Sequence, residues 1–301
     1  MYSYYNENTI IYVDGEYKKA TEAKIDLFGQ SLHYGYAVFE GIRAYKTASG
    51  EVKIFKAEEH FDRFRRSCEL IHMPYNYTNE ELITACYKVL ELNNLEEAYI
   101  RPLAYCPPNM TLKAASEMNV MICAWEWGAY LGEKLLKVMT SSFQRPNPKA
   151  FKIESKSAGL YVNSILASQE AKSAGYDEAL LLDLDGYVAE GPGANIFFEK
   201  DGKIVTPPLG AILPGITRAT VIELCEELNI PLEQRLFTTD ELKQADCAFF
   251  CGTAAELIGL ESLDGHAFGK PWAQSLGKLL QQAYKAKVLE KEFDRSSVKV
   301  A

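Results

Sequence analysis

The sequence predicts a mixed α/β protein made of two domains, and three observations support this. The chain has 301 residues, which is long for one compact unit and comfortable for two. Segments that alternate like strands are interspersed with segments in which apolar residues recur every three or four positions, as in helices. Two glycines interrupt this succession at 127–132. We therefore expect a smaller N-terminal domain over 1–126, an interdomain loop over 127–136 and a larger C-terminal domain over 137–301.

The composition is that of an ordinary globular protein able to bury a large core, with 48% hydrophobic and 24% charged residues. A net charge of −9 and the lack of clustered Lys and Arg argue against a nucleic-acid partner. The N-terminus lacks the basic and apolar regions of a signal peptide, and no apolar run is long enough to span a bilayer. We therefore expect a cytoplasmic protein without membrane or nucleic-acid partners.

The seven cysteines are an odd number without a C-x-x-C pair, and most of them lie in apolar segments. We interpret them as buried free thiols in a reducing compartment, which agrees with a cytoplasmic location. The four histidines are scattered without metal-ligand spacing, so we expect no metal site.

The first half of the chain is predicted to begin with strands. The apolar run 10–13 leads into Asp14-Gly15, which is a hairpin signal. In 33–45, two glycines lie among aromatic and β-branched residues, which predicts either a plain core strand or a strand whose backbone closely approaches something. A half-buried strand is expected over 52–56.

Two helices follow. The first has a buried stripe of apolar residues at three- and four-residue steps: Phe61, Phe64, Cys68 and Ile71. Arg63, Arg65 and Arg66 lie off that stripe; such arginines most often face water, yet an arginine is also well shaped to bind a phosphate. The second helix opens with the capping-box pattern Thr78-x-x-Glu81.

Two further strands are predicted over 99–105 and 120–125, separated by a loop over 106–112. Arg101 lies inside the first of these otherwise apolar strands. A buried arginine needs a partner, which would be a carboxylate of the protein or of a ligand.

The second half begins with a predicted strand over 135–139 and then reaches Lys156. This lysine lies among small residues just before a helix-patterned run that ends near Gly175. Most lysines are solvated, so Lys156 alone is a weak signal. A lysine in a poorly solvated site, however, has its ammonium form disfavoured and can act as a nucleophile or base.

Three strands follow, over 179–182, 187–189 and from Asn195 onward, and the chain is predicted to end in a helix over 272–288. Glu190 is a carboxylate at the end of the second of these strands, beside glycines. Two segments offer N–H groups to an anion: the helix start at 213–218 and the turn at 252–256. The helix start alone is most often simply a capped helix.

Together these parts suit a phosphorylated aldehyde cofactor. Such a cofactor needs a lysine for a Schiff base, an acidic partner for a pyridinium nitrogen and a phosphate cup at a helix N-terminus. Lys156, Glu190 and the two anion-binding segments supply those groups. From the chemistry alone, other possibilities stay open. A Schiff-base aldolase would also use Lys156, although it would not need the phosphate cup or Glu190, and a catalytically silent protein could keep the same fold.

The motifs are more specific than the chemistry. They are His33–Gly35, Val38–Arg43, Tyr99–Pro102, Trp127–Gly132, Lys156–Tyr161, Glu190–Gly191, Asn195–Phe197, Leu213–Arg218 and Gly252–Glu256. Through them nearly the whole chain resembles the branched-chain amino acid aminotransferases, in the fold-type IV group of pyridoxal-phosphate enzymes. The resemblance implies the fold-type IV architecture: two domains, each with a largely antiparallel sheet or barrel and packed helices, and the cofactor between them.

The resemblance also implies the reaction, a transamination between branched-chain L-amino acids (Leu, Ile, Val) and 2-oxoglutarate with pyridoxal 5'-phosphate. Lys156 would be the catalytic residue, which binds the cofactor covalently and then carries the proton between the substrate and the cofactor. Glu190 would bond the pyridine nitrogen, and Tyr161 the phenolic oxygen. The phosphate would be held by Arg63, Ile216, Thr217 and Thr253.

Substrate recognition is implied in the same way. The residues concerned are Tyr99, Thr253 and Ala254 for the α-carboxylate, Phe39 and Trp127 for the apolar side chain, and Arg101 with the partner subunit's Tyr34 for the γ-carboxylate of glutamate. In this family the sites lie at a subunit interface, so we expect at least a homodimer. Neither the preference among Leu, Ile and Val nor any larger assembly follows from the sequence.

Some positions depart from the family pattern. Ala194 stands where many bacterial members carry a glutamate, Leu160 stands where an asparagine is common, and the loop 106–112 is short. These positions bear on substrate breadth and not on the reaction. Other fold-type IV enzymes (D-amino acid transaminases, (R)-amine transaminases and aminodeoxychorismate lyases) share the lysine, the glutamate and the phosphate cup. Their first-half motifs differ from Phe39–Arg43 and from Tyr99-x-Arg101.

Overall fold

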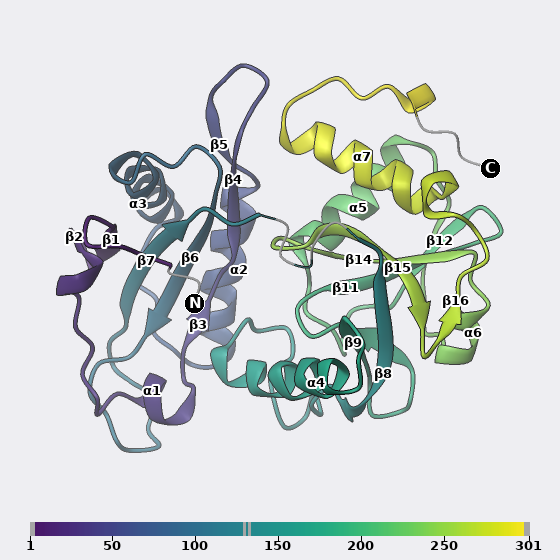
Figure 1. The fold of residues 1–301 in the computed structure, drawn as a ribbon. Helices are drawn as coiled ribbons and strands as arrows, with labels where there is room; N and C mark the ends of the chain where they lie inside the picture. The colour runs from purple at the N-terminus through teal and green to yellow at the C-terminus, as the bar shows by residue number, and fades with distance from the viewer. Residues whose placement is uncertain (1–3, 129–130, 132–133, 298–301) are drawn as a thin grey trace. The chain divides into compact units, whose positions relative to one another are not determined.

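The computed structural model describes residues 4–128, 131 and 134–297, which form two compact units (Figure 1). Unit 1 comprises residues 1–128 together with 155–159, and unit 2 comprises 129–154 and 160–301. The segment around Lys156 therefore belongs by its contacts to unit 1, although it lies far along the chain. Of the motif at 127–132, residues 129, 130 and 132 lie outside the described residues. The domain limits predicted from the sequence stay a prediction.

Unit 1 is built on a seven-stranded sheet in the order β2-β1-β7-β6-β4-β5, with β3 paired to β6 as well. The described pairings in it are antiparallel. Its strands are β1 (Ile10–Val13), β2 (Glu16–Lys19), β3 (Val38–Phe39), β4 (Ile42–Lys46), β5 (Val52–Ile54), β6 (Ala98–Tyr105) and β7 (Asn119–Trp125), and its helices are α1 (Gln30–Tyr34), α2 (Ala57–Leu70) and α3 (Asn79–Leu92). The hairpin predicted at Asp14-Gly15 is confirmed, because Val13 pairs with Glu16 across that turn.

The core of unit 1 lies where helices α2 and α3 pack against the sheet (Figure 1). Phe61, Phe64 and Cys68 of α2 have no exposed surface (0%), which confirms the predicted stripe. The capping box predicted for α3 is also present, because Thr78 and Glu81 each accept a hydrogen bond from the other's backbone N–H. The apolar pattern of each helix thus determines which face packs on the sheet.

The single strand predicted over 33–45 is wrong, because a helix end and two separate strands occupy that segment. Helix α1 ends at Tyr34, and Gly35 adopts a φ of +66°, a left-handed conformation that favours glycine. The predicted close approach of the backbone is confirmed at Gly41, where a Cβ would lie 1.8 Å from the Tyr99 Oη. The position of Tyr99 therefore requires a glycine beside it.

Unit 2 is built on a nine-stranded sheet, six strands of which close into a barrel. The order is β10-β9-β8-β15-β14-β11-β12-β13, with β16 paired to β15, and β10 also pairs with β11, which closes the ring. In that ring β8 is parallel to β9 and β15, and the other pairings are antiparallel, which confirms a largely antiparallel barrel. The strands are β8 (Leu136–Gln144), β9 (Glu178–Leu182), β10 (Val188–Glu190), β11 (Asn195–Lys200), β12 (Lys203–Thr206), β13 (Leu232–Gln234), β14 (Cys247–Gly252), β15 (Glu256–Leu263) and β16 (His266–Ala267), and the helices are α4 (Tyr161–Ser173), α5 (Ile216–Glu227), α6 (Thr239–Lys243) and α7 (Leu276–Val288).

Helix α4 is the helix predicted after Lys156, and it presents large apolar side chains outward. Val162 is 60% exposed and Ile165 is 65% exposed. The positions that α4 buries in unit 2 hold small residues, Ala167 and Ala171 among them. The helix therefore packs closely on its own unit and leaves an apolar face uncovered in the single chain.

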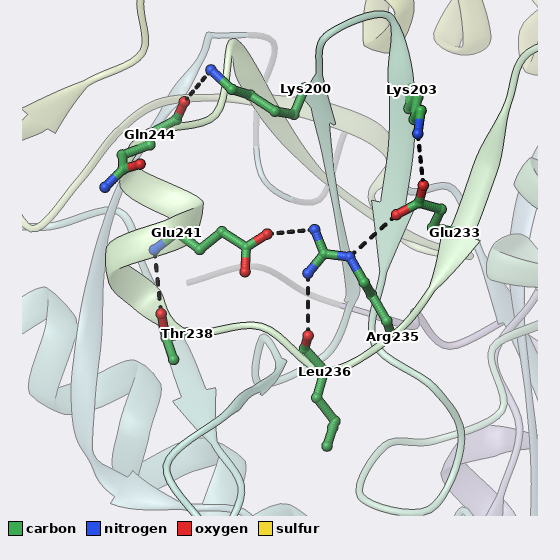
Figure 2. Close-up of polar contacts among 8 residues, drawn as sticks. All are labelled: Lys200, Lys203, Glu233, Arg235, Leu236, Thr238, Glu241 and Gln244. Carbon is green, nitrogen blue, oxygen red and sulfur yellow. Dashed lines mark hydrogen bonds and ion pairs between the residues drawn. The ribbon is translucent and has the colours of Figure 1, made fainter.

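A network of charged side chains connects the segment after β13 with α6 (Figure 2). Arg235 donates hydrogen bonds to Glu233 and Glu241, and Lys203 donates to Glu233 from β12. Thr238 caps α6 by accepting a hydrogen bond from the Glu241 N–H at 3.3 Å. Exposed ion pairs of this kind each contribute little to stability, so we ascribe to the network a local role in orienting α6.

Candidate active site

Lys156 is fixed in unit 1 through its backbone. Its N–H donates a hydrogen bond to the Ser67 Oγ on α2 at 3.0 Å, and its carbonyl accepts one from the Phe39 N–H at 3.1 Å. The small residues that surround Lys156 in the sequence allow this approach. A Cβ on Gly35 would lie only 2.9 Å from the Gly159 Cα, so the segment that precedes β3 needs a glycine where it meets the Lys156 segment.

The ε-amine of Lys156 lies in a half-buried and partly cationic setting. Burial lowers the pKa of Lys156 to about 8, and the charges of Arg63 and Arg101 act in the same direction, whereas Glu40 opposes them. The Nζ atom lies 5.0 Å from the centroid of the Phe39 ring. Lys156 therefore has a larger fraction of neutral amine at neutral pH than an ordinary lysine, as a nucleophile or base requires.

Four of the predicted substrate residues form one cluster of aromatic and cationic side chains in unit 1. The Arg101 Cζ lies 4.6 Å from the centroid of the Phe39 ring, and its Nη2 donates a hydrogen bond to the Tyr99 Oη at 3.3 Å. The ring of Trp127 packs edge-on against that of Tyr99, with their centroids 4.7 Å apart. Because Lys156 and Arg101 both lie near the Phe39 ring, the predicted catalytic amine and the predicted carboxylate-binding group are brought together.

A hollow of about 440 Å³ adjoins Arg101 in unit 1 and is lined in part by Tyr4, Tyr5 and Trp125. Sequence reasoning missed these three aromatic residues. Trp125 pairs with Tyr99 across β6 and β7, so the two side chains lie on the same face of the sheet. The pairing register of β6 and β7 would have shown that Trp125 lies beside Tyr99. The alternation of apolar residues within each strand alone does not give that register.

Arg63 is buried on α2 and is held by an acidic residue that the sequence reasoning also missed. The Glu40 carboxylate accepts hydrogen bonds from the Arg63 Nε at 2.7 Å and Nη2 at 2.8 Å, and the His60 Nδ1 lies 2.7 Å from it. Burial would raise the pKa of Glu40, but the charge of Arg63 and the His60 contact hold that pKa well below its usual range. The signal available in the sequence was the three-residue spacing of His60 and Arg63, which places both side chains on one face of the helix.

Tyr34 is the last residue of α1 and is 49% exposed. Its Oη donates a hydrogen bond to the carbonyl of Met110 at 3.3 Å. Its expected role in a partner subunit's site stays a prediction.

Glu190 ends β10 in unit 2, where it is 5% exposed. The Arg145 Nε lies 3.1 Å from its Oε1, and the Leu213 N–H donates to the same oxygen at 3.1 Å. The Asn195 Nδ2 donates to its Oε2 at 3.0 Å. The carboxylate thus meets one cation and two neutral N–H donors. Sequence reasoning assigned no role to Arg145 or Asn195, and the residues around Arg145 gave no signal of this contact.

The predicted anion-binding helix start is confirmed as a helix start, and it approaches the turn that follows β10. Ile216 and Thr217 are the first residues of α5, with Gly215 as the N-cap. Both are buried, with 9% and 3% of their surface exposed. A Cβ on Gly215 would lie 2.0 Å from the Asn195 Oδ1, so this glycine is what allows the approach. The N–H groups of the helix start therefore lie near the Glu190 turn.

The second predicted anion-binding turn lies against the same region of unit 2. Thr253 and Ala254 follow β14, which pairs with β11. A Cβ on Gly252 would lie 3.1 Å from the Gly193 carbonyl oxygen, so the two turns are in close contact. Tyr161 is the first residue of α4 in this unit. Unit 2 thus gathers a buried carboxylate, a helix start and a threonine-containing turn.

Each unit, taken by itself, holds groups that suit a phosphorylated aldehyde of the pyridoxal type. Unit 1 offers an amine with a lowered pKa and a buried guanidinium, and unit 2 offers a buried carboxylate and the N–H groups at a helix start. Among the described residues, no three His, Cys, Asp or Glu side chains gather as metal ligands would. Within the same part of the chain, every helix is too short or too polar to cross a membrane.

Comparison with known proteins gives the family. A family model described as amino-transferase class IV matches residues 37–263, which is more than half of the chain. The chain belongs to the class IV aminotransferases, in the branch whose curated members are named branched-chain-amino-acid aminotransferases. One of these relatives, from Pseudomonas aeruginosa, is 44% identical over 281 residues, which cover 91% of each chain. The predicted family is therefore confirmed.

Solved structures agree with this assignment. The branched-chain aminotransferase of Thermoproteus uzoniensis with norvaline gives a TM-score of 0.91 at 37% identity, covering 94% of this chain and 96% of that one. The branched-chain amino acid aminotransferase of Thermobaculum terrenum, solved in its PLP-form, gives a TM-score of 0.89 at 34% identity, covering 97% of this chain and 98% of that one. The predicted fold class is confirmed by these similarities.

Proposed function

We propose that the protein is a branched-chain-amino-acid transaminase, which exchanges the amino group between Leu, Ile or Val and 2-oxoglutarate with pyridoxal 5'-phosphate as its cofactor. The observation that carries this proposal is a lysine of lowered pKa that shares the Phe39 ring with the guanidinium of Arg101. The similarity to named branched-chain enzymes supports it, and favours it over the other fold-type IV reactions.

Each group of the cofactor has a suitable residue in this chain. When bound, pyridoxal phosphate supplies an electron sink that stabilises negative charge at the substrate Cα. Lys156, as a neutral amine, attaches the cofactor and then moves the proton at that carbon. Glu190 bonds the pyridine nitrogen, and Tyr161 bonds the phenolic oxygen. The residues assigned to the phosphate are Arg63, Ile216, Thr217 and Thr253, which offer a guanidinium, the N–H groups of a helix start and a hydroxyl.

The substrate groups are assigned in the same way. Phe39 and Trp127 surround the aliphatic side chain, and Tyr99 with the N–H groups of Thr253 and Ala254 holds the α-carboxylate. Arg101 binds the γ-carboxylate of glutamate. The Arg101 guanidinium lies over the Phe39 ring, so an apolar surface and a cation are both within reach of one substrate. This pairing explains how one pocket accepts both leucine and glutamate.

We further propose a cytoplasmic homodimer in which the partner subunit's Tyr34 completes the site. The exposed apolar side chains of α4 and the 49% exposure of Tyr34 in the single chain support an interface with a second copy. The seven cysteines are all free, which agrees with a reducing compartment.

A panel of amino donors and acceptors with added pyridoxal phosphate tests the proposal. L-Leucine or L-isoleucine with 2-oxoglutarate should turn over, and D-alanine should not. Lys156→Ala should abolish turnover, whereas Lys149→Ala, at an exposed position, should leave it unchanged. Undiminished turnover in Lys156→Ala, or a preference for D-alanine, would refute the proposal.

A further inference from the structure

We propose that Glu40 is a positioning residue for cofactor binding, which orients the Arg63 guanidinium toward the phosphate of pyridoxal phosphate. This inference rests on the proposed role of Arg63. Glu40 lies between β3 and β4, outside every group that contacts cofactor or substrate in the proposed function. It acts through the side chains it holds on α2.

The contact between Glu40 and Arg63 has the geometry of a fork. The Arg63 Nε donates to Oε1 of Glu40 at 2.7 Å, and the Arg63 Nη2 donates to Oε2 at 2.8 Å. Two parallel hydrogen bonds fix both the position and the plane of a guanidinium, which one bond does not. The fork uses the Nε and Nη2 groups on one edge of the guanidinium. Glu40 therefore determines the direction in which the remaining N–H groups of Arg63 point.

Glu40 itself is held from several sides and has no exposed surface (0%). The His60 Nδ1 lies 2.7 Å from Oε2, and the Gly41 N–H donates to the same oxygen at 3.2 Å. Because a carboxylate only accepts hydrogen bonds, Nδ1 is the protonated nitrogen of His60. A buried carboxylate with this many donors cannot turn without losing them, so it is a rigid support for Arg63.

The same face of α2 also reaches the catalytic lysine. His60, Arg63 and Ser67 follow at three- and four-residue steps, and Ser67 accepts a hydrogen bond from the Lys156 N–H at 3.0 Å. The helix thus positions the residue proposed for the phosphate and the residue proposed for the aldehyde from one face. Glu40 directly follows Phe39, the last residue of β3, and so connects that face of α2 to the end of β3. The N–H of Phe39 in turn donates a hydrogen bond to the Lys156 carbonyl at 3.1 Å.

Two substitutions separate orientation from charge. Glu40→Gln removes the charge and places an amide N–H₂ where one Arg63 donor is now bound. Glu40→Asp keeps the charge but withdraws the carboxylate by one methylene, about 1.5 Å, which breaks the fork. If orientation is the role of Glu40, both variants should bind the phosphorylated cofactor poorly.

The measurement is the dissociation constant of the apoprotein for pyridoxal phosphate and for pyridoxal, which lacks the phosphate. For Glu40→Gln and Glu40→Asp we expect roughly 10- to 100-fold weaker binding of pyridoxal phosphate, the loss typical of a charged hydrogen bond. Binding of pyridoxal should change less than about threefold, because Arg63 has no phosphate to meet. In an Arg63→Gln background, Glu40→Gln should add less than about twofold, because its effect acts through Arg63.

Glu199→Gln is the matched control. Glu199 is also fully buried (0% exposed) and ion-paired, to Lys270 at 2.6 Å, but it lies in unit 2 on β11. This variant should lower the melting temperature and leave both dissociation constants unchanged. If Glu40→Gln is too unstable to isolate, Glu40→Asp decides the question, because it retains the buried charge.

Four outcomes would overturn the inference. Tight binding of pyridoxal phosphate by Glu40→Asp would show that charge alone matters. Equal losses for pyridoxal and pyridoxal phosphate would show a general structural role. Weak binding by Arg63→Gln with normal binding by both Glu40 variants would refute the inference and leave the proposed function intact. Normal binding by Arg63→Gln would instead refute the phosphate role of Arg63 itself.

Discussion

At the scale of single residues, the unusual titration of Lys156 can be measured directly. Burial lowers the pKa of this lysine to about 8, with Arg63 acting in the same direction, so its amine should be mostly neutral above pH 8. Below that pH the neutral fraction should fall about tenfold per pH unit. Acylation of the apoprotein with an amine reagent at a series of pH values, read by mass spectrometry, should give a midpoint near 8 at Lys156. A midpoint close to that of an ordinary lysine, about 10.4, would show that the site does not activate this residue.

Arg101 offers a second prediction at this scale. Arg101→Ala should weaken the use of glutamate and 2-oxoglutarate by roughly 10- to 100-fold in kcat/KM, because a charged hydrogen bond to the γ-carboxylate is lost. Leucine makes no such contact and should lose far less. Steady-state kinetics with each donor measures the difference. Equal losses for glutamate and leucine would show that Arg101 is not the partner of the γ-carboxylate.

At the scale of elements, Gly41 lies between β3 and β4, and its backbone closely approaches Tyr99 of β6. A Cβ at this position would lie 1.8 Å from the Tyr99 Oη, so Gly41→Ala must displace Tyr99. We expect the KM values for leucine and glutamate to rise together, by about tenfold, because Tyr99 is proposed to hold the α-carboxylate that both share.

Gly269→Ala is a suitable comparison for Gly41→Ala, because a Cβ at Gly269 would meet no atom within 4 Å. That variant should behave as the wild type. Unchanged KM values in Gly41→Ala would show that the α-carboxylate is held elsewhere.

The elements also show which parts of the fold the periodicity of apolar residues can predict. The stripe of Phe61, Phe64 and Cys68 was predictable, because apolar residues at helical spacing must face the core. The split of 33–45 into α1, β3 and β4 was not predicted, because local spacing showed neither the end of α1 at Gly35 nor Tyr99, a residue far along the chain that occupies the space beside Gly41. Local patterns contain no information about a distant side chain of this kind.

At the scale of the whole molecule, the uncovered apolar face of α4 leads to a prediction about assembly. Ile165 is 65% exposed, so Ile165→Glu should leave the fold intact and place a charge in the proposed dimer interface. Sedimentation should show a shift from dimer toward monomer. Leu236→Glu, at another exposed apolar position (48%), should remain dimeric. An unchanged dimer in Ile165→Glu would exclude α4 from the interface.

The sequence by itself determined the family, most of the helices and strands, and the residues proposed for the reaction. These follow from periodicity, from turn chemistry and from motifs, all of which are properties of short segments. Lys156 could be recognised in this way because its small neighbours and the helix after it lie within a few residues.

Only the tertiary structure decided which groups hold the reactive residues in place. It paired Glu40 with Arg63, and Arg145 with Glu190, and it joined the segment of Lys156 to unit 1. The physical reason is that a buried charge must find a partner, and any opposite charge that the fold brings near can satisfy it. Which opposite charge comes near depends on strand register and helix packing, and local sequence patterns predict neither of these.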